Sequence, residues 1–321
     1  MQTTSSAAAR TSSGRLFSGI LFVFLGSASY GMLSTFVKMA YAEGFTTGEV
    51  TAAQSGIGAL VLTIMAVLVA RHGAAPTSKD KLKLMLVGMP MGLTSVVYYV
   101  AVQSIDASIA VVLLMQAIWM GVVFESVAQR TWPSAEKIVA VILILIGTLM
   151  AVDAFSATTA KLDPKGVFFG ILAAVSYTCM LAAVGNVCVD LHPVKRSQYM
   201  LYGSLIVALS FAFLTQLAPH YLDVHWVSEG FVRDREFRPE IFYGYGMLLA
   251  VFGTVLPPIL LNKGFPFTGV GLGSIISSIE LPFAALIAFA LLGESLNGLQ
   301  LAGIALILGS VVLLNYRMLK R

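Results

Sequence analysis

The chain has 321 residues, of which 58% are hydrophobic and 11% charged, with a net charge of +4 and a mean hydropathy of +0.87. Soluble domains carry about 25% charged residues, so this chain has too few charges to cover a water-facing surface, and a soluble enzyme or nucleic-acid-binding domain is excluded. Its two cysteines, Cys179 and Cys188, lie on opposite faces of one apolar run and predict neither a disulfide framework nor a metal site. The composition predicts an all-α polytopic membrane protein.

Long apolar runs define the expected spans, because a membrane-crossing helix needs about 20 largely apolar residues. Residues 1–15 are rich in Ser, Thr and Ala and are expected to form a disordered tail, and residues 317–321 form a second, short tail. The one long connection, 219–240, is polar and aromatic and is expected to fold against the membrane surface. Ten spans are predicted: 16–40, 48–70, 82–104, 107–128, 135–155, 166–189, 197–218, 241–262, 267–292 and 297–316.

The distribution of Lys and Arg predicts the orientation of these spans. With both termini in the cytoplasm, fourteen of the 20 basic residues fall in cytoplasmic segments, and Lys38 lies within the first span. Five fall outside: Lys161, Lys165, Arg233, Arg235 and Arg238. An excess of basic residues on the cytoplasmic side is the usual pattern. Short loops favour a bacterial inner (plasma) membrane, with an organelle as the alternative that the N-terminal tail leaves open.

The two halves of the chain are similar to each other. The segment ASYGMLSTFVK (28–38) resembles VSYTCMLAAVG (175–185), and ILILIGTLM (142–150) resembles IALILGSVV (304–312). Each half holds five spans, an odd number, so the second half is predicted to insert upside down relative to the first. The sequence thus predicts two inverted five-helix repeats, at 16–155 and 166–316. Inverted repeats with interrupted helices are typical of secondary transporters, whose binding site lies at the repeat interface.

Prolines inside the apolar runs predict breaks in the helices, because a proline removes a backbone donor and crowds the preceding turn. The predicted breaks lie at Pro90, Pro257, Pro258 and Pro282. Close to the last of them is Glu280, the deepest acid, with Ser277 one turn earlier on nearly the same face. A charge at the centre of a membrane helix costs about 2.5–3.5 kcal/mol. Glu280 is therefore predicted either to face a wet cavity, binding a cationic group or a proton, or to hold neighbouring helices together.

Other polar residues in the spans are candidates for the same cavity. Tyr30, Ser34 and Lys38 lie on one stripe of the first span, and Lys38 is expected either to bind a substrate carboxylate or to reach the membrane surface. Asn186 in 166–189 is either a cavity residue or a link between helices. The glycines of Gly88–Gly92 and Gly269–Gly273 are expected to allow close helix packing.

The third and fourth spans add aromatic and amide candidates. Tyr98 and Tyr99 point about 100° apart on a helix, so only one of them, taken as Tyr98, is expected to be central. Gln116 and Trp119 share a face near mid-membrane and are predicted to line the cavity. Glu125 points the opposite way and is expected to pair with a basic residue near the cytoplasmic end.

Three segments carry a resemblance to a known family: AFALLGESLNGLQLAGIALILGSVVLL (288–314), YGMLSTFVK (30–38) and SIE (278–280). The chain resembles an EamA-type member of the drug/metabolite transporter superfamily over essentially residues 16–316. The resemblance implies ten helices in a five-plus-five inverted fold, with the first four helices of each half around a cavity and the fifth peripheral. Gln54 stands where the family often has Arg, and Gln116-Ala117 replaces a Glu-Pro pair. These departures disfavour anionic substrates.

The predicted function is a secondary or facilitative carrier that exports small organic metabolites, such as amino acids or amphipathic compounds, by alternating access. If transport is coupled, protons bound by Glu280 are the expected coupling ions. An importer with the same fold is one alternative, and a membrane enzyme or receptor is another, although no catalytic pair and no signalling module is visible in the sequence. The expected partners are a small-molecule substrate and the lipid bilayer, with no cofactor, metal or nucleic acid. A monomer suffices, because one chain contains both halves of the pathway, and a dimer stays an open alternative.

Overall fold

The computed structural model describes residues 2–69, 75–105, 107–151, 163–222, 236–292 and 297–319. Within these ranges every regular element is a helix. The first half holds α1 (Gln2–Ala42), α2 (Thr47–Leu68), α3 (Ser78–Ser104), α4 (Ala107–Leu114), α5 (Ala117–Gln129) and α6 (Ala135–Ala151). The second holds α7 (Pro164–Asn186), α8 (Pro193–Ala212), α9 (Ala218–Leu222), α10 (Tyr245–Leu249), α11 (Leu256–Ser277), α12 (Glu280–Leu292) and α13 (Gly298–Leu319). Two π-helical segments, η1 (Phe213–Leu217) and η3 (Ala250–Val255), and a 3-10 turn, η2 (Pro239–Phe242), complete the second half.

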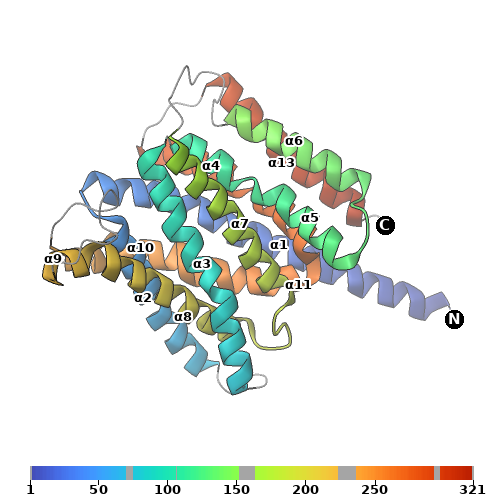
Figure 1. Ribbon diagram of the computed structural model, residues 1–321. Coiled ribbons are helices and arrows are strands. Elements are labelled where there is room, and N and C mark those ends of the chain that lie inside the picture. The colour runs from blue at the N-terminus through green and yellow to red at the C-terminus, as the bar shows by residue number, and fades with distance from the viewer. Residues whose placement is uncertain are drawn as a thin grey trace.

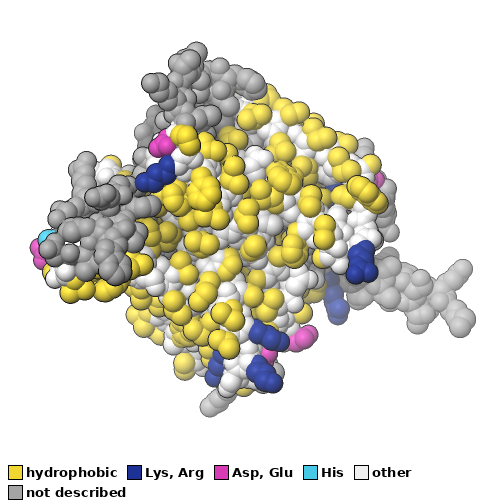
Figure 2. Space-filling view, viewed as in Figure 1, with side chains coloured by type: hydrophobic (Ala, Val, Ile, Leu, Met, Phe, Trp, Pro, Cys, Tyr) yellow, Lys and Arg dark blue, Asp and Glu magenta, His cyan; other side chains and the backbone are white. Residues whose placement is uncertain are grey.

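The helices have the length and the surface of membrane spans. By length and composition, seven helical stretches in the described ranges can cross a membrane, and the apolar stretches Glu280–Leu291 and Gly298–Leu313 are shorter. Large apolar side chains such as Leu68, Val127 and Phe168 are exposed. Figure 2 shows apolar side chains spread across one face, with charged side chains gathered toward its margins. An apolar surface of this extent suits lipid rather than water, so the chain is a helical membrane protein.

The ends of the chain differ from the sequence-based expectation. Helix α1 begins at Gln2, so the segment 1–15, predicted to be a disordered tail, is helical from its second residue. Its alanines favour a helix, and Figure 1 shows this part of α1 projecting beyond the bundle. Helix α13 continues to Leu319, past the predicted end of the last span. Of the long connection 219–240, residues 223–235 lie outside the described ranges.

Helices of the two halves pack against each other. Helix α1 lies along α11 and α12, α3 lies along α7 and α8, and α2 also packs on α8. The contact between α3 and α8 is close, because a Cβ atom on Gly88 would overlap the backbone carbonyl of Met200. The predicted packing role of Gly88 is confirmed. Helices α6 and α13 lie side by side at one edge of the bundle (Figure 1), where the resemblance placed the fifth span of each half.

The observed helix interruptions do not all lie where the sequence predicted breaks. Helix α3 runs unbroken through Pro90, so the break predicted there is wrong. Membrane helices tolerate an internal proline, and the Pro90 carbonyl itself links α3 to α7, because it accepts from the Ser176 hydroxyl at 2.9 Å. Helix α11 bends at Gly269, whose φ of 72° favours glycine. This bend replaces the connection that the sequence predicted between 262 and 267.

The other predicted prolines lie beside interruptions. Pro257 and Pro258 lie in the first turn of α11, directly after η3. Pro282 lies in the first turn of α12, after the two residues Ser278 and Ile279 that separate α11 from α12. A further interruption, at Met115 and Gln116 between α4 and α5, was not predicted.

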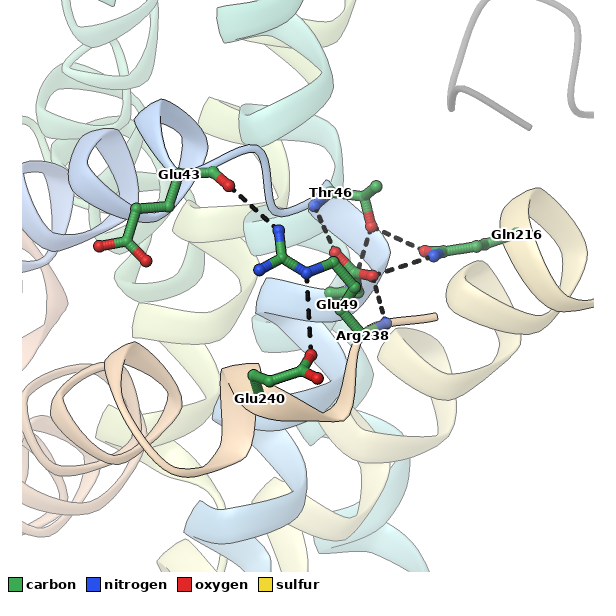
Figure 3. Close-up of polar contacts among 6 residues, drawn as sticks. All are labelled: Glu43, Thr46, Glu49, Gln216, Arg238 and Glu240. Carbon is green, nitrogen blue, oxygen red and sulfur yellow. Dashed lines mark hydrogen bonds and ion pairs between the residues drawn. The ribbon is translucent and has the colours of Figure 1, made fainter. Parts of the chain in front are cut away.

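At the end of the bundle where α1 leads into α2, six residues form a polar cluster, called here the clasp: Glu43, Thr46, Glu49, Gln216, Arg238 and Glu240 (Figure 3). Its centre is a capping box at the start of α2. The backbone N–H of Thr46 donates to Oε2 of Glu49 at 2.8 Å, and the backbone N–H of Glu49 donates to the Thr46 hydroxyl at 3.1 Å. The sequence predicted no role in such a cluster for any of the six, and Arg238 entered only the count of basic residues in external segments.

The clasp joins the two halves of the chain, because Gln216 and Arg238 reach Glu49 from the second half. Gln216 donates to Oε1 of Glu49 at 3.2 Å, and the backbone N–H of Arg238 donates to the same oxygen at 2.7 Å. The Arg238 guanidinium donates to the Glu43 carbonyl at 3.1 Å and lies over the Phe45 ring. The Glu49 side chain is 0% exposed.

A second buried polar group, Arg196 at the start of α8, ties three helices together. Its guanidinium donates to the backbone carbonyls of Val184 at 2.6 Å, Asn262 at 2.9 Å and Val187 at 3.2 Å. The first and last of these carbonyls lie at the C-terminal end of α7, where a cation is favoured by the helix dipole. Arg196 therefore fixes the end of α7 against α11.

Candidate functional site

A pocket lies between helices of both halves of the chain. Helix α1 supplies Tyr30, Gly31 and Leu33, and α3 supplies Met91, Thr94, Ser95, Tyr98 and Tyr99. The remaining lining residues are Leu114, Met115, Tyr177, Met180, Gly253, Glu280, Leu281 and Ala284. Helix interruptions surround the pocket, because Met115 separates α4 from α5, Gly253 lies in η3 and Glu280 begins α12. Such interruptions often mark functional sites in membrane helices.

Glu280 is the only acid among the described residues that line this pocket. Within the described part of the chain its carboxylate accepts one hydrogen bond, from the Tyr177 hydroxyl at 3.2 Å. Its position as the first residue of α12 places it at the positive end of the helix dipole, which favours an anion. Helix α1 approaches this point closely, because a Cβ atom on Gly31 would overlap the Glu280 carbonyl oxygen. Glu280 is thus held in place by the backbone while its carboxylate retains capacity for a further partner.

Four tyrosines form the polar and aromatic wall of the pocket. Tyr30 and Tyr177 meet edge to face, with ring centroids 6.5 Å apart, and Tyr98 and Tyr99 lie 6.0 Å apart. The Tyr99 hydroxyl donates to the side-chain oxygen of Gln54 at 3.4 Å. Tyr30 and Tyr98 make no hydrogen bond through their hydroxyls to any of the described residues. The tyrosines therefore offer both ring faces and oxygen atoms to a ligand.

The structure brings several of the sequence-predicted residues together. Tyr30, Tyr98 and Glu280 line the pocket, and Gln54 lies directly behind Tyr99. Ser277 lies at the end of α11 and accepts a hydrogen bond from Ser27 of α1 at 3.1 Å, next to the helix interruption.

Other predicted cavity residues lie elsewhere. Lys38 and Asn186 are exposed, and neither lines the pocket. Gln116 and Trp119 are hydrogen-bonded to each other at 2.9 Å, and Trp119 is 39% exposed. Neither side chain lines the pocket, and both residues lie where α4 ends and α5 begins, an interruption that the predicted continuous span did not include. The side chain of Ser34 lies outside the described part of the structure.

Sequence reasoning missed Tyr177 and Tyr99. Tyr99 was set aside because adjacent residues point in different directions on a helix, but both Tyr98 and Tyr99 line the pocket. For Tyr177 a signal was present, since the Ser-Tyr pair of 28–38 recurs in 175–185 and places Tyr177 at the position equivalent to Tyr30. In the folded chain these two equivalent tyrosines are in contact.

Glu125, expected to pair with a basic residue rather than to face the cavity, forms an ion pair with Lys137 of α6. That prediction is confirmed. The Glu125 carboxylate also lies against the backbone of Gly269 and Gly271, at the bend of α11. No group of three or more His, Cys, Asp or Glu side chains suited to a metal ion occurs in the described ranges.

Apolar helices of membrane length around a central pocket with one acid are the features of a membrane transport protein. The EamA-like transporter family matches the chain twice, at residues 17–152 and 164–316, and the chain belongs to this family. It is 26% identical over 314 residues to the uncharacterized inner membrane transporter YicL of Salmonella typhimurium, covering 91% of this chain and 97% of that protein. It is 24% identical over 234 residues to the uncharacterized transporter sll1319 of Synechocystis, covering 71% and 65% of the two chains.

A solved structure titled only as a crystal structure of a protein has the same fold. Its TM-score is 0.73 at 13% sequence identity, and the superposition covers 95% of this chain and 99% of that chain. At this identity the likeness concerns the fold alone.

Proposed function

We propose that the protein is a secondary or facilitative carrier that exports small organic metabolites through the central pocket by alternating access. The observation that carries this proposal is the position of the pocket, because its walls come from both halves of the chain and its one acid begins a helix next to an interruption. Movement of the halves relative to each other would change access to such a site without altering the bonds within each helix.

Two findings support the proposed arrangement as two inverted five-helix repeats. The family matches the chain twice, over segments close to the predicted repeats 16–155 and 166–316. The tyrosines at equivalent positions of the two repeats, Tyr30 and Tyr177, meet in the pocket. Five spans in each half make ten in total, so both termini would lie on the same side of the membrane. The excess of Lys and Arg in the segments on that side favours the cytoplasm. The bacterial inner membrane is the proposed location.

Transport is tested with purified protein in liposomes that are preloaded with unlabelled compound and assayed for counterflow of the same compound in labelled form. The panel contains amino acids, small amines and neutral amphipathic compounds. We expect saturable counterflow of at least one compound, lost in Glu280→Gln and retained in Glu240→Gln, a matched substitution at an exposed position. Absence of saturable counterflow for the whole panel would contradict the proposal.

Coupling and direction need separate measurements. If protons bound by Glu280 drive transport, a pH gradient across the vesicle should drive accumulation by the wild type, and the dependence should vanish in Glu280→Gln. An unchanged dependence in that variant would exclude coupling through Glu280 and leave facilitated exchange. Accumulation of labelled substrate inside cells that express the protein, compared with cells that do not, would favour the importer over the exporter.

A further inference from the structure

We propose that the pocket selects organic amines, that is, small ligands with a positively charged nitrogen and an apolar or aromatic body, in preference to amino acids and carboxylates. This inference rests on the proposed transport function and narrows its substrate class. Three independent properties of the pocket carry it: its charge, its aromatic walls and the direction of its hydrogen bonds.

The charge of the pocket is unbalanced. Glu280 is its one acid, and none of the described lining residues is Lys, Arg or His. Lys38, which the sequence analysis named as a cavity candidate, is exposed and lies outside the lining. A buried charge needs a partner of opposite sign. The Glu280 carboxylate can supply that partner to a cationic ligand, whereas a ligand carboxylate would find none among the described lining residues.

The walls suit the body of such a ligand. Tyr30, Tyr98, Tyr99 and Tyr177 present aromatic rings, and Met91, Met115 and Met180 add polarizable apolar surface. A cation within about 6 Å of an aromatic ring is attracted by the negative face of the ring. Methionine side chains adapt to irregular apolar shapes. Aromatic rings beside a carboxylate therefore favour a charged nitrogen attached to an apolar group.

The hydrogen-bonding groups of the pocket are mostly acceptors. Thr94 and Ser95 donate their hydroxyl protons to their own helix, at the carbonyls of Pro90 and Met91, at 2.8 and 3.4 Å. The Tyr177 hydroxyl donates to Glu280, and the Tyr99 hydroxyl donates to Gln54. The oxygens of these hydroxyls remain available as acceptors.

A primary ammonium carries three donors and no acceptor, which matches this arrangement. A carboxylate carries only acceptors, so its oxygens would depend on the hydroxyls of Tyr30 and Tyr98. By the same reasoning, an amino acid should bind more weakly than an amine and more tightly than a carboxylate, because its ammonium fits the pocket and its carboxylate does not.

The test uses four compounds that share a phenyl ring and a short chain: phenethylamine, phenylalanine, 3-phenylpropionate and 2-phenylethanol. Binding to purified wild-type protein in detergent is measured by isothermal titration calorimetry at neutral pH. We expect phenethylamine to bind at least about tenfold more tightly than the other three, a factor typical for the loss of one charged interaction. This comparison needs no variant, so it remains decisive if a substituted protein does not fold.

Two variants then locate the interaction. Glu280→Gln should raise the Kd of phenethylamine at least about tenfold, and Glu240→Gln, at an exposed position, should leave it unchanged. The inference is overturned if phenethylamine does not bind, if any of the other three compounds binds as tightly, or if Glu280→Gln binds phenethylamine as the wild type does.

Counterflow of the same four compounds separates the failure of this inference from failure of the proposed function. Saturable counterflow of phenylalanine or 2-phenylethanol but not of phenethylamine would preserve the carrier and reject the amine selectivity. Tight, Glu280-dependent binding of phenethylamine without counterflow of any panel compound would preserve the selectivity of the pocket and reject transport.

Discussion

Two acids in the described part of the protein, Glu49 and Glu280, are surrounded in opposite ways. In the clasp, Glu49 is fully buried, and its two oxygens accept from two backbone N–H groups and from Gln216. In the pocket, Glu280 is partly exposed and accepts one hydrogen bond from the described residues, that of Tyr177. Both carboxylate oxygens of Glu49 therefore have hydrogen-bond donors from the protein, whereas the Glu280 carboxylate keeps most of its acceptor capacity for another partner.

The difference separates a structural acid from a functional one. A carboxylate whose acceptor capacity is filled by the protein holds segments together, and its removal leaves buried donors without partners. A carboxylate with spare capacity in a cavity can exchange partners, as a binding site requires. Glu49 and Glu280 can be compared by the same substitution, Glu→Gln, which removes the charge and turns one oxygen into a donor.

The largest expected effect on stability is that of Glu49→Gln. Each oxygen of Glu49 accepts from a backbone N–H, of Thr46 or of Arg238, so either orientation of the amide leaves one buried N–H facing another donor. We expect a loss of about 3 kcal/mol in the free energy of unfolding, measured as a lower Tm in detergent. An unchanged Tm would show that the clasp does not hold the two halves together.

A smaller loss is expected from Gly269→Ala, which tests the bend of α11, the helix that leads toward Glu280. The backbone of Gly269 has φ 72° and ψ 172°, and a Cβ atom there would approach Oε1 of Glu125 to 2.6 Å. This conformation is essentially restricted to glycine, so we expect a loss of about 2 kcal/mol. The control is Gly309→Ala in α13, where a Cβ atom meets open space. Equal Tm values for the two variants would contradict the bend.

Gln216→Leu should weaken the clasp without removing its acid. The variant loses the donor to Glu49 and the acceptor of the Thr46 hydroxyl, but both backbone N–H groups keep their carboxylate. We expect a loss of about 1 kcal/mol. In a double-mutant cycle with Glu49→Gln, the two losses should be less than additive, because both residues belong to one network. Strict additivity would mean that the two residues act independently.

The smallest effect on stability, with the largest on transport, is expected for Glu280→Gln. The variant loses one hydrogen-bonded charge that has spare capacity, so the free energy of unfolding should change by less than about 1 kcal/mol. Counterflow should be lost in Glu280→Gln and retained in the folded fraction of Glu49→Gln. A result in which Glu280→Gln melts like Glu49→Gln and still transports would reverse the roles assigned to the two acids.

Part of the site was predictable because it depends on local chemistry. The depth of Glu280 in an apolar run and the stripe that contains Tyr30 follow from composition and helical periodicity, and both residues line the pocket. Gln116 and Trp119 also followed from periodicity, but they lie at the interruption between α4 and α5 and do not line the pocket. An interruption without a proline or glycine leaves little trace in the sequence, so the direction of side chains beyond it could not be predicted.

By itself, the sequence determined the class of the protein, its apolar helices and the presence of one deep acid, because hydropathy and charge act residue by residue along the chain. Only the tertiary structure decided which acid is satisfied and which is not. Gln216 and the backbone of Arg238 lie far from Glu49 in the sequence and meet it only when the two halves pack. The free capacity of Glu280 is equally a property of what packs beside it, and no local pattern encodes that.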